Sequence, residues 1–134
     1  MVTTAYFDTS AAMKLLVPEA ESGALFEELA RPGRRLIASW LLHTELHCAA
    51  GRNPTAITLD AVSEALDLIT LIDVTRGDLL VAGTHAPLRS NDALHLATAL
   101  RLGADEMITY DSELAEAARN AGIRTVAPTR RSND

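Results

Sequence analysis

The sequence predicts a small α/β domain with a mainly parallel sheet, and two observations support this prediction. Short apolar segments alternate along the chain with longer segments of helical periodicity. The apolar segments are continuous rather than interleaved with polar residues, which is typical of strands covered on both faces of a parallel sheet. No stretch of linker composition interrupts this rhythm, so we expect residues 1–134 to form a single domain.

The strands and helices follow one another in a regular order. Five segments are predicted as strands: Thr4–Asp8, Leu36–Ser39, Thr70–Val74, Glu106–Tyr110 and Thr125–Ala127. Seven segments are predicted as helices: Ser10–Leu16, Glu21–Ala30, Trp40–Ala50, Thr55–Ile69, Gly77–Ala86, Asn91–Leu102 and Ser112–Ala121.

Proline and glycine mark most of the helix ends, taken in chain order. Pro18 disfavours a helical conformation for the residue before it, so the first helix ends there. Pro32-Gly33 is a turn signal after the second helix, and Gly51 follows the third. Apolar residues spaced three and four positions apart define one face of the fourth helix, Thr55–Ile69. Pro87 follows the fifth helix, and a glycine follows each of the last two.

Composition limits the function classes. The net charge is −6, with 18 acidic against 12 basic residues, which argues against a sequence-tolerant nucleic-acid coat protein. Acids gathered around cations would give the same total, so an enzyme acting on nucleic acid stays open. Cys48 is the only cysteine, which excludes an internal disulfide framework and a cysteine-based zinc cluster. No signal peptide and no apolar run of about 20 residues is visible, so we expect a cytoplasmic protein that does not cross a membrane.

Most of the acids, including Glu28 and Asp78, are predicted to lie on solvated helical faces. Two others each close a predicted strand: Asp8 after "AYF" and Asp111 after "MITY". Ligands of open α/β sheets bind beyond the carboxyl ends of the strands, where the strand order reverses. The alternative for each residue is a helix N-cap that accepts backbone N–H bonds.

Two further acids lie in apolar helices. Asp92 falls in the first turn of a helix that is apolar nearly all round, so its N-terminus is expected to face a crevice. The alternative is simple stabilisation of Asp92 by the helix dipole. Glu45 shares a helical face with Leu41, Leu42, Cys48 and Ala49, which places it on the buried face. A buried glutamate is rare unless it is paired.

The histidines give weaker signals. His43 and His47 are four residues apart, but Glu45 does not converge with them on the helix, so a zinc site is not expected. His95 lies three residues after Asp92, and it either orients that carboxylate or is a packing histidine of the core.

If Asp8, Glu45, Asp92 and Asp111 meet, their charges require compensation. Two carboxylates about 4 Å apart repel by roughly 4 kcal/mol at an effective dielectric near 20. Such a cluster takes up protons or binds a cation, and all-oxygen ligands select Mg²⁺ or Mn²⁺. That chemistry indicates hydrolysis of phosphodiester bonds.

These motifs resemble the PIN-domain ribonucleases, most closely the VapC-type toxins of bacterial toxin–antitoxin pairs. The resemblance covers about residues 4–128 and rests on "YFDTSAAMKLLVPE", "ELHCAA", "RSNDALHLATALRLGADEMITYDSELAEAARNAGI" and "VAP". By resemblance, the catalytic, metal-binding acids are Asp8, Glu45, Asp92 and Asp111. Ser10 and Thr109 match hydroxyl residues of the family, and Ser10 is expected to position a water or a phosphate.

The resemblance also implies a fold and partners. The expected fold is PIN-like, three α/β/α layers around a five-stranded parallel sheet in the order 3-2-1-4-5. The expected activity is Mg²⁺- or Mn²⁺-dependent endoribonuclease action by the toxin of such a pair. Its expected partners are the RNA substrate, a cognate VapB-type antitoxin and a second copy in a homodimer. Arginines would steer the RNA, and the candidates are Arg34, Arg35, Arg52, Arg89, Arg130 and Arg131.

Two other functions are weighed against this one. "FDTS" faintly resembles the start of haloacid dehalogenases, which form an aspartyl phosphate. Ser10 stands where they have a second Asp, and no lysine follows Lys14, so this reading is disfavoured. The other alternative is a PIN-like module that binds RNA or protein without cutting.

Overall fold

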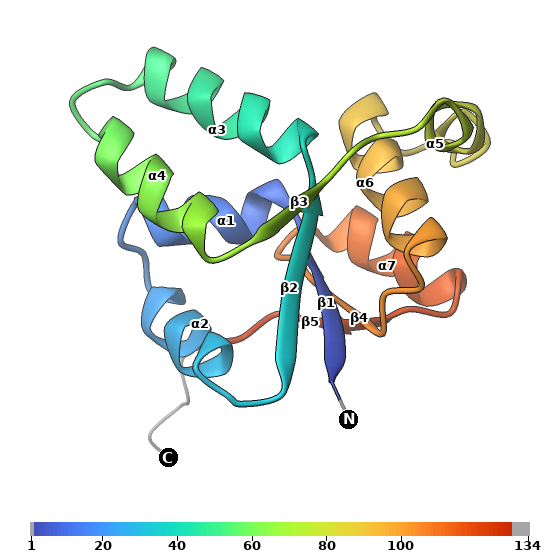
Figure 1. Cartoon of the computed structure of the whole chain (residues 1–134), viewed down its shortest axis with the longest axis horizontal. Helices are drawn as coiled ribbons and strands as arrows, with labels where there is room; N and C mark the ends of the chain where they lie inside the picture. The colour runs from blue at the N-terminus through green and yellow to red at the C-terminus, as the bar shows by residue number, and fades with distance from the viewer. Residues whose placement is uncertain (1, 130–134) are drawn as a thin grey trace.

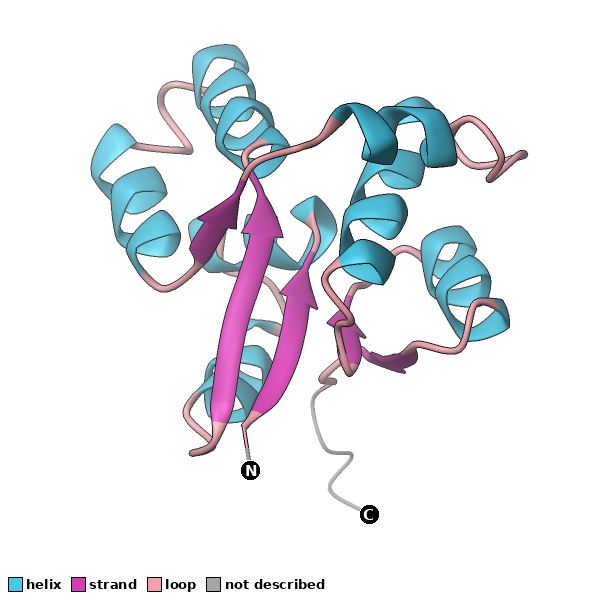
Figure 2. Ribbon diagram, turned by 45° about the vertical axis from the view of Figure 1, so that its right-hand side comes forward, coloured by secondary structure: helices cyan, strands magenta, loops and turns pink. Residues whose placement is uncertain are grey.

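A computed structural model describes residues 2–129, which form a five-stranded parallel sheet between two groups of helices (Figures 1 and 2). The sheet has the order β3-β2-β1-β4-β5. Its strands are β1 (Thr3–Phe7), β2 (Arg34–Ser39), β3 (Thr70–Ile72), β4 (Glu106–Ile108) and β5 (Arg124–Val126). The α/β class and the strand order are confirmed.

In residues 2–129, seven helices cover the sheet. They are α1 (Thr9–Leu16), α2 (Ser22–Leu29), α3 (Leu41–Arg52), α4 (Leu59–Asp67), α5 (Arg76–Ala82), α6 (Ser90–Arg101) and α7 (Ser112–Asn120). Figure 1 shows α1 to α4 on one side of the sheet and α5 to α7 on the other, which gives the three expected layers.

The centre of the sheet explains why the apolar segments are continuous. In β1, Ala5, Tyr6 and Phe7 are fully buried, because helices cover both faces of the strand. Ala5 lies opposite Leu36 of β2 on one side and Glu106 of β4 on the other. The core therefore runs through the middle of the sheet, and the carboxyl ends of β1 and β4 meet at one edge.

Element ends differ from the prediction by a few residues, and caps explain two of the differences. Asp8 lies outside β1, because it is the N-cap of α1. Helix α4 begins at Leu59 rather than Thr55, because the hydroxyl of Thr58 accepts the N–H of Ala61 at 3.1 Å and starts the helix there.

Asp78 is buried, so the prediction that it faces solvent is wrong. It forms a capping box with Thr75 at the start of α5, and its Oδ1 accepts a hydrogen bond from Arg101 Nε of α6 at 2.8 Å. Burial alone would raise the pKa of Asp78, but the hydrogen bond from Arg101 and those of the capping box outweigh it and lower the pKa. Asp78 thus joins α5 to α6.

A buried ion-pair network lies at the other edge of the sheet, where the strands begin. Glu106 is 1% exposed, with Arg34 Nε 2.7 Å from Oε1 and an Arg124 nitrogen 2.6 Å from Oε2. Arg34 forms an ion pair with Glu106 and donates a hydrogen bond to the carboxylate of Glu28 at 2.6 Å. Arg34 is therefore a structural residue and not the RNA contact predicted, and Glu28 is half-buried rather than solvated.

Two further points concern the predictions. None of the helices in residues 2–129 is long and apolar enough to cross a membrane. Arg130 and Arg131, both candidates for RNA contact, lie outside the described residues.

Candidate active site

The four acids line one cleft at the edge of the sheet where the strands end. Asp8 follows β1, Asp111 follows β4, Glu45 projects from α3, and Asp92 lies in the first turn of α6. The cleft has a volume of about 500 Å³. Because β1 connects to β2 on one side and lies beside β4 on the other, the strand order reverses at this point. The remaining lining residues are Ser10, Arg89, Ser90 and Asn91.

Asp8 is both a helix cap and a cleft residue. It is 2% exposed, and its Oδ1 accepts the N–H of Ala11 at 3.0 Å. The hydroxyls of Ser10 and Thr109 also donate to it, each at 2.8 Å. Burial raises the pKa of the Asp8 carboxyl, and these hydrogen bonds oppose the shift only in part. Asp8 is therefore the N-cap of α1, as one alternative predicted, and it also lines the cleft at the end of β1.

Ser10 and Thr109 tie the two strand ends together. Besides donating to Asp8, the Ser10 hydroxyl accepts the N–H of Tyr110 at 2.9 Å. The Thr109 hydroxyl likewise accepts the N–H of Asp111 at 3.0 Å. A hydroxyl has one hydrogen, and in this conformation Ser10 and Thr109 each donate theirs to Asp8. Their role in the structure is to fix Asp8 and the backbone before Asp111.

Asp111 and Asp92 complete the acidic side of the cleft. Asp111 is the N-cap of α7, where its Oδ1 accepts the N–H of Leu114 at 2.9 Å. Asp92 is half-buried, and its pKa is raised by burial first and then by the negative charges of Asp111 and Asp8. Glu45 adds a smaller contribution of the same sign. Asp92 therefore lies within electrostatic reach of the other three carboxylates.

Glu45 is half-buried and paired with a histidine from another helix. His95 Nε2 lies 2.6 Å from Glu45 Oε1. Burial tends to raise the pKa of Glu45, but the hydrogen bond with His95 leads the contributions that lower it. Of the two readings of His95, the core histidine is confirmed, because its side chain is fully buried; its carboxylate partner is Glu45 and not Asp92. Cys48, predicted on the buried face of α3, is exposed.

Sequence reasoning also missed Tyr6. Its hydroxyl lies 2.7 Å from His95 Nδ1 and accepts the N–H of Ser39 at 3.1 Å. The only sequence signal was a tyrosine inside an apolar strand, two residues before Asp8. The rings of His43 and His47 stack on each other, with their centroids 4.1 Å apart.

The cleft fits a hard divalent ion held partly through water. Within residues 2–129, no three His, Cys, Asp or Glu side chains converge closely enough to be direct ligands of one ion. Mg²⁺ keeps several waters and uses one or two carboxylates, so it needs no such preformed cage. The oxygen-only donors match Mg²⁺ or Mn²⁺, and the repulsion that raises the pKa of Asp92 is relieved by a cation.

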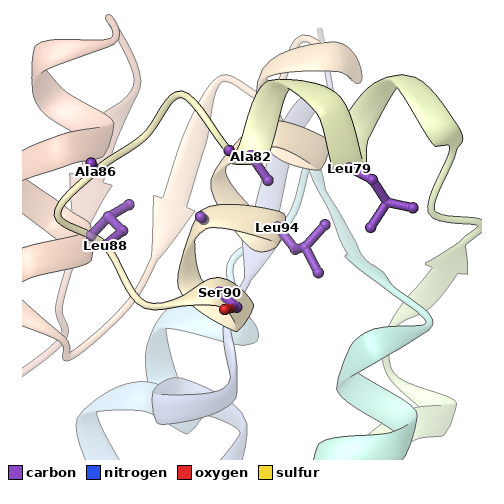
Figure 3. Close-up of a pocket in the computed structure, with 8 residues that line it drawn as sticks. Leu79, Ala82, Ala86, Leu88, Ser90 and Leu94 are labelled. Carbon is purple, nitrogen blue, oxygen red and sulfur yellow. The ribbon is translucent and has the colours of Figure 1, made fainter.

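A second pocket, between α5 and α6, offers no comparable chemistry (Figure 3). Its volume is about 320 Å³, and it is lined by Leu79, Ala82, Gly83, Ala86, Leu88, Ser90, Ala93 and Leu94. Apart from the Ser90 hydroxyl, these side chains are apolar, so the pocket has no acid, base or nucleophile of its own.

Comparisons with known proteins agree with this geometry. The family described as PIN domain matches residues 5–120. Ribonuclease VapC46 of Mycobacterium tuberculosis is 37% identical over 92% of this chain and 97% of the relative. Ribonuclease VapC35 of the same organism is 35% identical over 92% of this chain and 96% of its own.

Two solved structures share the fold. Mycobacterium tuberculosis VapC20, described as a sarcin–ricin loop cleaving toxin, superposes with a TM-score of 0.70 at 18% identity, covering 92% of this chain and 99% of that one. VapBC-1 of Haemophilus influenzae superposes with a TM-score of 0.71 at 18% identity, covering 92% of this chain and 97% of that one. The chain therefore belongs to the PIN-domain family, within its VapC group.

Proposed function

We propose that this chain is a Mg²⁺- or Mn²⁺-dependent endoribonuclease and the toxin of a toxin–antitoxin pair. The observation that supports this most is the convergence of Asp8, Glu45, Asp92 and Asp111, from four separate elements, on one cleft at the switch point of the sheet. The curated relatives in the VapC group are named ribonucleases, which gives the same activity.

The proposed roles follow from the contacts of each residue. The four carboxylates would hold the ion, which when bound lowers the pKa of a water and stabilises charge on the departing oxygen. Ser10 and Thr109 keep Asp8 in place through their hydroxyl hydrogens. Arg89, at the start of α6, lines the same cleft and supplies positive charge for the RNA phosphate.

The RNA strand has an open path away from the cleft. A groove of about 530 Å³ between α1 and α3 shares Glu45 and Asn91 with the cleft. Arg52 lines this groove, so Arg52 and Arg89 are the arginines we assign to RNA contact. Arg35 is exposed near the start of β2, at the opposite edge of the sheet, and is not expected to contact the RNA near the cleft.

The proposed partners follow from the structural neighbours and from the family resemblance. Structural neighbours include a toxin–antitoxin complex from Klebsiella pneumoniae and VapBC2 from Rickettsia felis bound to a promoter DNA fragment. On that basis we assign this chain a VapB-type antitoxin; the homodimer and action in the cytoplasm are expectations carried over from the sequence analysis. The exposed Leu79, Leu80 and Val81 of α5 offer apolar surface for protein contacts. Light scattering of the purified chain measures its oligomeric state directly.

Cleavage of single-stranded RNA by purified protein tests the proposal. Asp8→Asn keeps the shape of the side chain and removes its charge. Losing several kcal/mol of charge stabilisation lowers the rate more than about 100-fold. Glu113→Gln is the matched control, because Glu113 is an exposed acid on α7 outside the cleft. EDTA should abolish cleavage by both the wild type and this control.

The same experiment distinguishes the alternative function. A wild type that binds RNA in the presence of Mg²⁺ or Mn²⁺ but never shortens it would be a binding module and not a ribonuclease. Cleavage at the wild-type rate by Asp8→Asn would instead remove Asp8 from the catalytic set.

A further inference from the structure

We propose that His95 is a positioning residue, which holds Glu45 Oε1 so that the rest of the Glu45 carboxylate faces a divalent ion in the cleft. This inference rests on the proposed function, because it assigns Glu45 to the ion. It adds two residues, His95 and Tyr6, that do not line the cleft themselves.

The contact between His95 and Glu45 has a defined direction. His95 is fully buried in α6, and its Nε2 lies 2.6 Å from Glu45 Oε1. A carboxylate that holds a cation is ionised and can only accept hydrogen bonds, so in the 2.6 Å contact Glu45 is the acceptor. Nε2 therefore carries a proton and donates it. A separation this short is typical of a hydrogen bond to a charged acceptor.

The other ring nitrogen is fixed from the strand side. Tyr6 Oη lies 2.7 Å from His95 Nδ1 and accepts the backbone N–H of Ser39 at 3.1 Å. Burial raises the pKa of Tyr6, so the phenol keeps its hydrogen. With the Ser39 N–H directed at the oxygen, the phenol hydrogen finds its acceptor in Nδ1. The two rings also pack edge to face, with centroids 5.6 Å apart.

These contacts form a chain of donors that ends on the carboxylate. This series of hydrogen bonds runs from the backbone of β2 through Tyr6 of β1 and His95 of α6 to Glu45 of α3, in that order. Three of these elements are held by the core, whereas Glu45 is the half-buried member that lines the cleft. The buried members of this hydrogen-bond series therefore fix the orientation of the Glu45 carboxylate at the cleft.

The simpler reading is a histidine that merely satisfies its own buried nitrogens. A core histidine needs a partner for each nitrogen, but it does not need that partner to be a carboxylate of the acidic cleft. Glu45, in turn, has solvent within reach and could be hydrated without His95. Hydrogen-bonding partners that orient metal ligands typically contribute 10–100-fold to metal affinity or activity.

Mn²⁺ binding, measured by calorimetry on the metal-free full chain, tests the proposal without using activity. His95→Leu removes the donor and keeps an apolar side chain of moderate size. His95→Gln keeps an N–H donor close to the position of Nε2. We expect His95→Leu to weaken Mn²⁺ binding by about 10–100-fold and His95→Gln to stay within about threefold of the wild type. The denaturation midpoint of each variant is measured alongside.

Folding effects are separated from positioning by the comparison between the two variants. If His95→Leu does not fold, His95→Asn replaces it, because its shorter amide reaches toward Tyr6 but not Glu45. Equal losses of Mn²⁺ affinity in the Gln variant and in the Leu or Asn variant would overturn the proposal, as would unchanged affinity in all of them. A wild type that binds no Mn²⁺ would instead contradict the proposed function itself.

Discussion

Arg34→Met is expected to destabilise the fold strongly, because it leaves Glu106 buried without its main partner. The Glu106 side chain is 1% exposed, and that of Arg34 is 10% exposed. The substitution removes the Arg34 ion pairs to Glu106 and to Glu28, together with a hydrogen bond to the Glu28 carbonyl at 2.8 Å. Methionine keeps the volume of the aliphatic stem.

The magnitude follows from this burial. Breaking a buried ion pair by removing one partner costs about 3–5 kcal/mol, against a total stability of about 5–15 kcal/mol for a small domain. Arg124, the second partner of Glu106, is 68% exposed, so Arg124→Met should cost about 1 kcal/mol or less. Replacing both buried members by Arg34→Met with Glu106→Leu should restore most of the loss, because the fully buried charge of Glu106 is removed and Glu28 keeps its contact with Arg31.

Urea denaturation is measured on the wild type, on Arg34→Met, Glu106→Leu and Arg124→Met, and on the double variant Arg34→Met with Glu106→Leu. The first two single variants and the double variant give the coupling free energy between Arg34 and Glu106. We expect a coupling free energy of at least about 2 kcal/mol. A cost below about 1 kcal/mol for Arg34→Met, equal to that of Arg124→Met, would refute the reasoning. It would show that the network behaves as an exposed salt bridge.

Two further predictions concern the cleft and its surroundings. Burial and the charges of neighbouring acids raise the pKa of Asp92 in the folded state. A group with a raised folded pKa stabilises the protein below its unfolded pKa, and this contribution is lost as the pH rises through the folded pKa. Asp92→Asn should therefore stabilise the metal-free protein at pH 7, by on the order of 1 kcal/mol, and flatten its stability profile above about pH 4. Denaturation in EDTA at several pH values measures this, and a destabilised variant at pH 7 would contradict it. Arg52→Gln and Arg89→Gln should each weaken RNA binding and reduce the slope of log affinity against log salt by about 1. Fluorescence anisotropy in the inactive Asp8→Asn background measures the RNA affinity and its salt dependence, and Arg35→Gln is the control expected to leave both unchanged. Equal effects of all three arginine variants would mean that RNA binding depends on net charge and not on the groove.

Local sequence patterns were enough to predict the elements and the positions of the four acids. The ends of β1 and β4 could be located from apolar runs; Asp8 directly follows β1, and Asp111 lies three residues after β4. Helical spacing placed Glu45 on the side of α3 that faces the fold. The strand order, which makes β1 and β4 neighbours, came from the family resemblance, because hydrophobic periodicity does not report which strands pair.

The main misses concern partners that are remote in sequence. Asp78 has the local context of a solvated first-turn acid, and only Arg101 on another helix explains its burial. Glu106 begins a strand beside polar residues, so nothing nearby indicates that Arg34 and Arg124 neutralise it. His95 was correctly predicted as a core histidine, but its partner Glu45 was not found, since a helical wheel contains no information about a second helix. Periodicity identifies a buried face but not what lies against it.

The central claim is that the four carboxylates form one site for a divalent ion. Calorimetric titration of the metal-free protein with Mn²⁺ tests it most directly, on the wild type and on Asp8→Asn, Glu45→Gln, Asp92→Asn and Asp111→Asn. The account predicts binding by the wild type, unchanged binding by Glu113→Gln, and binding at least about 10-fold weaker in each of the four cleft variants. Wild-type affinity retained in all four cleft variants would contradict it.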